Sequence, residues 1–274
     1  MTPAGHPTFI RFYLWQGRRW KTLIHALDGA YAGLWLGLLR PRHFEAVDDL
    51  HYRSNPSYNG ERHNSSGLMD WEALAIDAFF QGAGRLAVIG AGGGRELLAL
   101  ERRGHAVDGF ECNPALVAFA EGFLSRHGAT GTVRALARDA APAPAAYEGA
   151  IIGWSAYALI VGRTRRIALL HGLRASLPPD APLLLSFFTE REPATRLKTV
   201  YRVARAMRRL LRRPPPEFGD DLIPTFVHRF SRDEIEAELR DAGFRLARYE
   251  PQGRGKYDSG WAVALAEPLS ADAG

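Results

Sequence analysis

The sequence contains little cysteine and little lysine, and each shortage excludes something. Cys112 is the only cysteine in 274 residues, so the chain can form neither a disulfide framework nor a cysteine-based metal cluster. This composition is consistent with a reducing compartment. Lys21, Lys198 and Lys256 are the only lysines, so arginine supplies nearly all of the positive charge. The formal net charge of +5 does not by itself predict binding to nucleic acid.

Long apolar runs are also missing. The N-terminus lacks the basic start, apolar core and cleavage site of a secretory signal. The most apolar window, from Ala26 to Leu39, is about fourteen residues long and contains Asp28, which makes it too short to span a membrane. We therefore expect no membrane span and a cytoplasmic location. No pair of His, Asp and Glu residues has the spacing of metal ligands, so we predict no metal ion.

From residue 85 onward the sequence alternates short apolar runs with amphipathic stretches, which is the pattern of βαβ units. A chain of this length with 46% hydrophobic residues can bury a full core. The pattern predicts strands at residues 86–90, 106–111, 133–137, 149–154, 182–188, 244–250 and 261–266, and helices at 95–103, 114–126, 164–176 and 231–242. We expect an α/β fold.

The alternation stops at residues 190–230, where a basic helix is followed by three prolines and an irregular segment. We interpret this stretch as an insertion in a core that covers residues 85–267. Residues 1–84 are aromatic-rich and are expected to form a helical N-terminal cap or lid. Residues 268–274 are expected to form a flexible tail.

A glycine turn, VIGAGGGRE, lies between the first predicted strand and the first predicted helix of the core. Turns of this kind present free backbone N–H groups to a ligand. The spacing of Gly90, Gly92 and Gly94 is G-x-G-x-G, and Arg95 stands where a dinucleotide-binding turn has its third glycine. A nucleotide-triphosphate loop would need Gly-Lys-Ser/Thr at its end, which is absent. The triphosphate option is therefore excluded, and the dinucleotide option is disfavoured.

Acidic residues stand at the ends of the next two predicted strands. Glu111 closes the second strand, where a carboxylate can accept hydrogen bonds from both hydroxyls of a ribose. Asp139 follows the third strand, where it could accept a hydrogen bond from the exocyclic amine of an adenine. The alternative for each is a solvated acid at a strand end or in a loop.

Together these segments resemble the class I S-adenosylmethionine-dependent methyltransferases. The motifs that carry the resemblance are VIGAGGGRE, GFECNP, RDA and YEGAIIGW, together with the closing pair of strands, and it spans roughly residues 85 to 267. It implies a Rossmann-like seven-stranded sheet, mostly parallel with an antiparallel last strand, and helices on both faces. It also implies S-adenosyl-L-methionine as cofactor. The residues that would bind it are Gly90, Ala91, Gly92, Gly94, Arg95, Glu111, Cys112, Asp139, Ala140 and Trp154.

One position departs from the family pattern. The family often has an acidic residue two positions before the first glycine, and this sequence has Val88 there. The methionine end of the cofactor must then be held by backbone groups, by Arg95 or by the N-terminal segment.

Methyl transfer from a sulfonium needs orientation and desolvation, and it needs a general base only if the acceptor must lose a proton. The resemblance places the reactive methyl group beside the segment after the fourth strand, which contains Trp154 and Tyr157. Candidate catalytic residues are Tyr157, His228 and His63. Candidate substrate-binding residues are Tyr58, Asn64, Trp154 and Tyr157. Each of these residues could instead be a core, loop or surface residue.

We expect methyl transfer to an O or N atom of a small-molecule acceptor. The alternatives are a methyltransferase that acts on RNA, protein or lipid, an NAD-dependent oxidoreductase, and an inactive module that keeps the fold. Within the insertion, residues 196–213 form a basic helix, and no acid lies between Glu192 and Glu217. This helix could be a solvated face, or it could attract an anionic substrate, a lipid surface or RNA. It lacks the interleaved aromatics of single-stranded RNA binders, so no nucleic acid is expected.

Overall fold

The computed structural model describes residues 8–55, 58–143, 145–189, 195–251 and 259–268. The chain divides into two compact units: residues 1–40 with 190–224, and residues 41–189 with 225–274. This division differs from the expected one, because residues 41–84 belong with the sheet and residues 1–40 belong with the insertion. The tail that we expected at 268–274 lies, apart from residue 268, outside the described residues.

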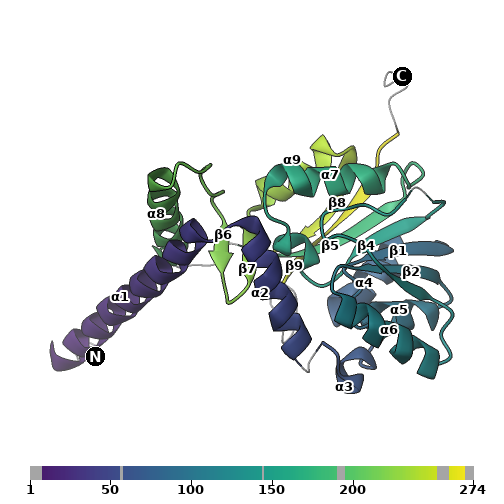
Figure 1. Cartoon of the computed structure of the whole chain (residues 1–274), viewed down its shortest axis with the longest axis horizontal. Helices are drawn as coiled ribbons and strands as arrows, with labels where there is room; N and C mark the ends of the chain where they lie inside the picture. The colour runs from purple at the N-terminus through teal and green to yellow at the C-terminus, as the bar shows by residue number, and fades with distance from the viewer. Residues whose placement is uncertain (1–7, 56–57, 144, 190–194, 252–258, 269–274) are drawn as a thin grey trace, which may run out of the picture. The chain divides into compact units, whose positions relative to one another are not determined.

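The larger unit is built on a twisted sheet (Figure 1). Its parallel strands lie in the order β3-β2-β1-β4-β5, and β9 pairs antiparallel with β5 and with β8. The mostly parallel sheet with an antiparallel last strand agrees with the expectation. The strands are β1 (Arg85–Ile89), β2 (Ala106–Glu111), β3 (Thr132–Ala135), β4 (Gly149–Ile152), β5 (Pro182–Thr189), β8 (Phe244–Glu250) and β9 (Gly260–Ala266). The carboxyl ends of the parallel strands therefore meet at one edge, which is where ligands bind in such sheets.

Helices cover both faces of this sheet (Figure 1). They are α2 (Pro41–Ser54), α3 (Glu61–Asn64), α4 (Asp70–Phe79), α5 (Arg95–Glu101), α6 (Pro114–Arg126), α7 (Arg163–Arg174) and α9 (Arg232–Asp241), with a 3-10 turn η1 (Ala156–Leu159). Local sequence fixes several ends. The Asn113 side chain accepts hydrogen bonds from the first turn of α6, and Ser231 and Glu234 form a reciprocal capping box on α9. Gly243 follows α9 with φ +80°.

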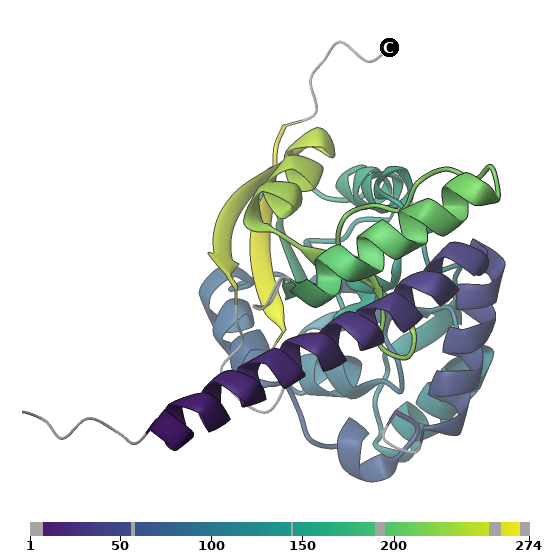
Figure 2. The same cartoon turned by 90° about the vertical axis from the view of Figure 1, so that its left-hand side faces the viewer.

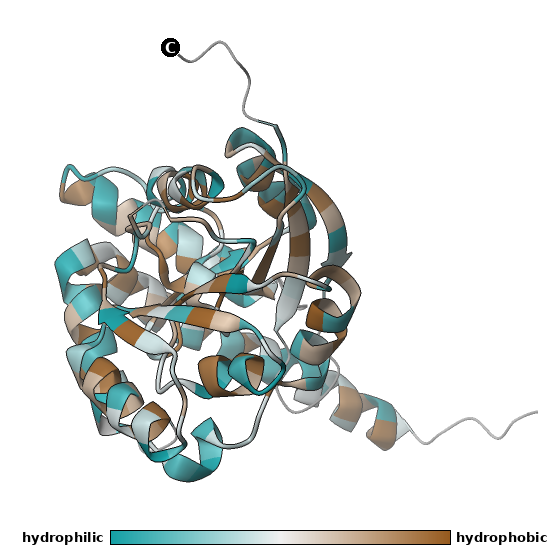
Figure 3. Ribbon diagram, turned by 90° about the vertical axis from the view of Figure 1, so that its right-hand side faces the viewer, coloured by the Kyte–Doolittle hydropathy of each residue, from teal (hydrophilic) through white to brown (hydrophobic). Residues whose placement is uncertain are grey.

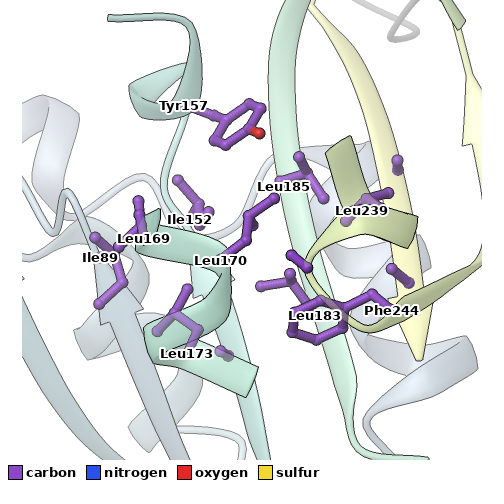
Figure 4. Close-up of a cluster of buried hydrophobic side chains, with 14 of the residues drawn as sticks. Ile89, Ile152, Tyr157, Leu169, Leu170, Leu173, Leu183, Leu185, Leu239 and Phe244 are labelled. Carbon is purple, nitrogen blue, oxygen red and sulfur yellow. The ribbon is translucent and has the colours of Figure 1, made fainter. Parts of the chain in front are cut away.

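Alternate strand residues divide the core into two clusters because successive side chains point to opposite faces. Ile89 and Leu183 pack with Leu170 of α7 and Leu239 of α9 (Figure 4). Val88, one residue earlier, packs in the cluster of α4, α5 and α6. Figure 3 shows hydrophobic residues along the strands, while the helices carry alternating hydrophobic and hydrophilic bands. The sheet is therefore covered on both sides.

Two short strands were not expected in the insertion. β6 (Asp220–Leu222) belongs to the smaller unit, and β7 (Phe226–Phe230) belongs to the larger one. β7 pairs in parallel with the end of β5 through Phe188 and Thr189. The last part of residues 190–230, which we interpreted as irregular, thus extends the sheet. Such short segments lack enough residues to show an alternating pattern by themselves.

The smaller unit is built on two long helices, α1 (Thr8–Leu38) and α8 (Thr195–Leu210). They run side by side in the same direction, and three glycines of α1 allow close contact (Figure 2). A Cβ on Gly29 would lie 2.8 Å from the Arg196 carbonyl oxygen, and one on Gly33 would lie 2.6 Å from the Val200 carbonyl oxygen. On Gly37 it would lie 2.5 Å from Met207 Cβ. By length and apolarity, α1 and α2 qualify as a membrane span only together, as a pair bent by 117°; none of the described helices qualifies by itself.

Candidate functional site

The glycine turn after β1 is held in a left-handed backbone. Gly90, Gly92 and Gly94 have φ of 69°, 54° and 94°, where a side chain would be strained. The N–H groups of Gly90 and Ala91 donate to the Phe110 carbonyl at 2.8 and 3.0 Å, which ties the turn to β2. A Cβ on Gly92 would meet no atom within 4 Å. The turn is therefore fixed on one side and open at Gly92.

Glu111 joins this turn to the start of α6. Its Oε2 accepts from the Gly92 N–H at 2.9 Å, and its Oε1 accepts from the Asn113 N–H at 2.8 Å. The residue is buried, with 6% of its surface exposed. The structure thus brings together the glycine turn and the acid that the sequence placed at the next strand end. Each carboxylate oxygen retains a second lone pair for a ligand hydroxyl.

The segment from Tyr58 to Asn64 packs against the turn at Gly93. A Cβ on Gly93 would lie 2.5 Å from the Tyr58 carbonyl oxygen and 2.6 Å from Asn64 Oδ1. Asn64 is buried, and its amide nitrogen donates to the carbonyls of Tyr58 and Gly60. Asn64 therefore stabilises its own loop. Its donor is thus used within the segment, and its role as a substrate-binding residue stays a prediction.

Four aromatic rings gather beside the turn. The ring centroids of Tyr58, His63 and Trp154 lie 6.2 to 6.4 Å from one another, although Trp154 follows β4, far along the chain. Tyr52 of α2 adds a fourth ring, 4.8 Å from Tyr58. Trp154 is oriented by its Nε1–H, which donates to Ser259 Oγ at 3.1 Å. Burial and the nearby Arg95 cation lower the pKa of His63, which favours the neutral imidazole.

No model of a known protein family matches the chain, and no curated protein matches it. Many solved structures do. A methyltransferase that depends on S-adenosylmethionine, from Methanosarcina mazei, has a TM-score of 0.58 at 18% identity, covering 73% of this chain and 99% of that chain. The 1,6-didemethyltoxoflavin-N1-methyltransferase of Burkholderia thailandensis, solved with 1,6-didemethyltoxoflavin and S-adenosylhomocysteine, has a TM-score of 0.58 at 16% identity and covers 84% and 92%. The chain has the class I methyltransferase fold.

A fold of this kind does not fix the reaction. The [4+2]-cyclase SpnF also matches, with a TM-score of 0.55 at 16% identity over 72% of this chain and 80% of that chain. The function must therefore be argued from the residues that the methyltransferase fold brings together here.

Arg95 does not serve the role that we considered for it. Its guanidinium is 2% exposed, and it donates to both oxygens of Glu72, to Glu96 and to the Gly67 carbonyl. These carboxylates raise the pKa of Arg95 further. The side chain anchors α4, and the segment at Gly67 that precedes α4, to the start of α5. This pairing corrects the expectation that Arg95 binds the methionine end of the cofactor.

Tyr157 and His228 are both fully buried, with 0% of their surfaces exposed. Tyr157 lies in the hydrophobic cluster of Figure 4. Its hydroxyl donates to Glu238 at 2.5 Å, and Glu238 is paired with Arg166. The His228 ring packs on Phe230. A side chain without an exposed surface cannot receive an acceptor, so the catalytic and substrate roles considered for these two residues are corrected to structural ones.

Three other predicted cofactor residues, Cys112, Asp139 and Ala140, are partly exposed. Asp139 is partly exposed and accepts from Arg165 Nε at 2.5 Å, and this hydrogen bond lowers the pKa of its carboxyl. Ala140 closes a turn by donating its N–H to the Ala137 carbonyl. Burial and the charge of Glu111 raise the pKa of the Cys112 thiol to about 12, so the thiol is neutral at physiological pH. The cofactor roles of these three residues stay predictions.

Sequence reasoning missed the contribution of α2. Asp48 pairs with Arg138 at 2.6 Å, and Tyr52, one helical turn later, lies between Tyr58 and these charges. Asp48 is 2% exposed, and its Oδ1 has no hydrogen-bond partner among the described residues. Burial is the main cause that raises the pKa of Asp48 to about 6. The only available signal was the i, i+4 spacing of Asp48 and Tyr52 on a helix.

Proposed function

We propose that the protein is an S-adenosylmethionine-dependent methyltransferase that transfers a methyl group to an O or N atom of a small-molecule acceptor. The observation that carries this proposal is the position of Glu111, whose carboxylate bridges the glycine turn and the start of α6. An acid in this position can accept both ribose hydroxyls of an adenosyl group while it keeps the turn in place. The open backbone at Gly92 provides room for the group beside it.

The residues present fit this cofactor at its adenosyl end. Glu111 would hold the ribose, and Asp139 and Tyr52 would border the adenine. At the methionine end, the backbone of the glycine turn and the N-terminal segment are the remaining holders, because Arg95 is paired with Glu72 and Glu96. When bound, S-adenosylmethionine supplies a methyl group on a sulfonium.

The acceptor would bind among the rings of Tyr58, His63 and Trp154. Such a set of rings favours a planar or aromatic acceptor, which can stack on them. His63 is the proposed general base: its lowered pKa keeps the imidazole neutral, so it can take a proton from an O–H or N–H of the acceptor. The rings would also exclude water from the reacting atoms.

Calorimetric titration tests the cofactor. We expect S-adenosylmethionine and S-adenosylhomocysteine to bind and NAD not to bind. Glu111→Gln and Glu111→Ala should each weaken binding at least tenfold, because charge-assisted hydrogen bonds are lost. Glu121→Gln, on the exposed side of α6, is the matched control and should bind as the wild type does. Binding of NAD instead, or unchanged affinity in both Glu111 variants, would contradict the proposal.

A second experiment identifies the acceptor. The protein is incubated with methyl-labelled S-adenosylmethionine and a cell extract that is fractionated into small molecules, protein, RNA and lipid. We expect the label in the small-molecule fraction. Transfer mainly to RNA, protein or lipid would overturn the small-molecule part of the proposal and leave the cofactor part standing.

A further inference from the structure

The N-terminal part of α1, residues 8–25, is exposed throughout, unlike the glycines at 29, 33 and 37, which are buried. α8 begins to pack on α1 at Gly29, where Arg196 and Thr199 meet the helix. Residues 8–27 extend beyond this point over about 30 Å at 1.5 Å per residue (Figure 2). Large hydrophobic side chains that are exposed along such a length of helix are characteristic of an interaction surface.

Most of these side chains form one stripe along α1, which we call the aromatic stripe, while Ile10, Leu14 and Trp15 are exposed on other faces of the helix. Its members recur every three or four residues, the spacing of one helix face. They are Phe9, Phe12, Tyr13, Trp20, Leu23, Ile24, Leu27 and Tyr31, with exposed fractions between 47% and 77%. Tyr31, the last member of the stripe, is 66% exposed, while the neighbouring Ala32 and Gly33 are buried on the side of α1 that contacts α8. The aromatic stripe therefore faces away from α8.

The charge on the rest of α1 indicates what covers the stripe. Arg11 and Arg18 lie on the face across from the stripe, and Arg19 and Lys21 lie at its two edges. Residues 1–27 contain no Asp or Glu, and the first acid, Asp28, is already paired with Arg196. Residues 1–40 and 190–224 together contain 14 Lys and Arg and 6 Asp and Glu, a net +8, which leaves the remaining residues at −3.

This charge distribution favours an anionic surface, rather than a second copy of the chain, as the partner that covers the aromatic stripe. In a dimer whose two aromatic stripes face each other, the cationic segments before Asp28 of both copies would lie side by side without acids to pair with, which is unfavourable. A stripe of Trp, Tyr and Phe flanked by Arg and Lys, on a helix segment without acids, is the composition of helices that lie in the headgroup region of a bilayer.

We propose that α1 docks the protein on an anionic lipid bilayer, lying in the plane of the interface. The aromatic stripe enters between the headgroups, Arg19 and Lys21 at its edges contact the lipid phosphates, and Arg11 and Arg18 add to the attraction by the anionic surface. The proposal goes beyond the proposed function and does not depend on it, because no residue of the glycine turn or of the ring cluster takes part.

Vesicle co-sedimentation with the full-length protein tests this proposal. Two vesicle types are used: phosphatidylcholine alone, and phosphatidylcholine with about one third phosphatidylglycerol, each at low and at high salt. We expect binding to the anionic vesicles at least tenfold stronger than to the neutral ones, and weaker at high salt because the charge attraction is screened.

Variants of the aromatic stripe and matched controls test whether this face of α1 contacts the bilayer. Leu23→Ser/Leu27→Ser should reduce binding at least tenfold, because buried apolar surface is lost. The control, Leu50→Ser/Leu74→Ser, removes leucines of 64% and 48% exposure from α2 and α4 and should bind as the wild type does. All four leucines are exposed, and circular dichroism verifies the fold. Arg18→Gln/Lys21→Gln should weaken binding to anionic vesicles and reduce its salt dependence.

Three outcomes would overturn the proposal: no binding to anionic vesicles at low salt, equal loss in the stripe variant and its control, or a stripe-dependent dimer in light scattering without vesicle binding. The third outcome would make the aromatic stripe a contact between copies of the chain. None of these outcomes affects the calorimetric test of the cofactor.

Discussion

At the scale of single residues, His63 connects the environment of the ring cluster to the proposed chemistry. Burial and the Arg95 cation lower its pKa, so the neutral base persists to lower pH than for an ordinary histidine. With the acceptor identified, His63→Gln should reduce kcat/KM about 100-fold or more. The acid limb of the wild-type pH–rate profile should lie below pH 6.5, the ordinary histidine pKa, and should be absent from the variant.

His127→Gln is the control for this prediction, because that histidine pairs with Glu61 at the end of α6. It should keep the wild-type rate and pH profile. Equal kcat/KM in His63→Gln and the wild type at every pH would exclude a general base at this position and leave orientation as the contribution of the ring cluster.

Asp48 makes stability depend on pH. Its pKa rises from 3.8 to about 6 on folding, so the folded state holds this proton more tightly than the unfolded state does. The stabilisation is complete below about pH 4 and is lost as the pH rises through 6, a change of about 3 kcal/mol. Asp48→Asn does not titrate, so its free energy of unfolding should fall less between pH 4 and pH 7 than that of the wild type.

Urea unfolding at several pH values measures this difference. Asp49→Asn, which breaks the surface pair with Arg53, controls for the loss of an ion pair from the same helix. Parallel pH profiles for Asp48→Asn and the wild type would show that Asp48 is not the source of the dependence.

At the scale of elements, the contact of α1 with α8 depends on glycine spacing. Gly33→Val would place a side chain within 2.6 Å of the Val200 carbonyl and 2.9 Å of Val203 Cβ, so the helices must separate. We expect loss of a few kcal/mol from this unit, typical of overpacking. Amide exchange in residues 195–210 should accelerate. Gly17→Val, on the same helix where a Cβ meets no atom within 4 Å, should leave this exchange unchanged.

At the scale of the whole molecule, ligand binding should protect one unit selectively. S-adenosylhomocysteine at 100 times its Kd should raise the free energy of unfolding by about 2.7 kcal/mol. Hydrogen exchange should slow at residues 88–94 and 111–113 and in the described part of residues 48–64. Residues 8–27 should exchange at the same rate with and without ligand. Protection confined to other strands would contradict the proposed position of the cofactor.

The sequence by itself determined which segments form the strands and that the glycine turn and Glu111 each stand at the end of a strand. The alternation of apolar runs, the G-x-G-x-G spacing and the position of Glu111 are local patterns, and parallel strands must bring their carboxyl ends to one edge. The N-cap at Asn113 and the capping box at Ser231 are local in the same way, because each depends on residues only a few positions apart.

Only the tertiary structure decided which polar residues are already paired and which rings meet. Arg95 and Tyr157 carry suitable groups, but Glu72 and Glu238 occupy them from 23 and 81 residues away. Asp48 and Tyr52 reach the site because α2 packs beside the strand ends, through contacts such as Asp48 with Arg138. Burial and long-range pairing depend on every element around a residue, and a sequence read locally contains neither.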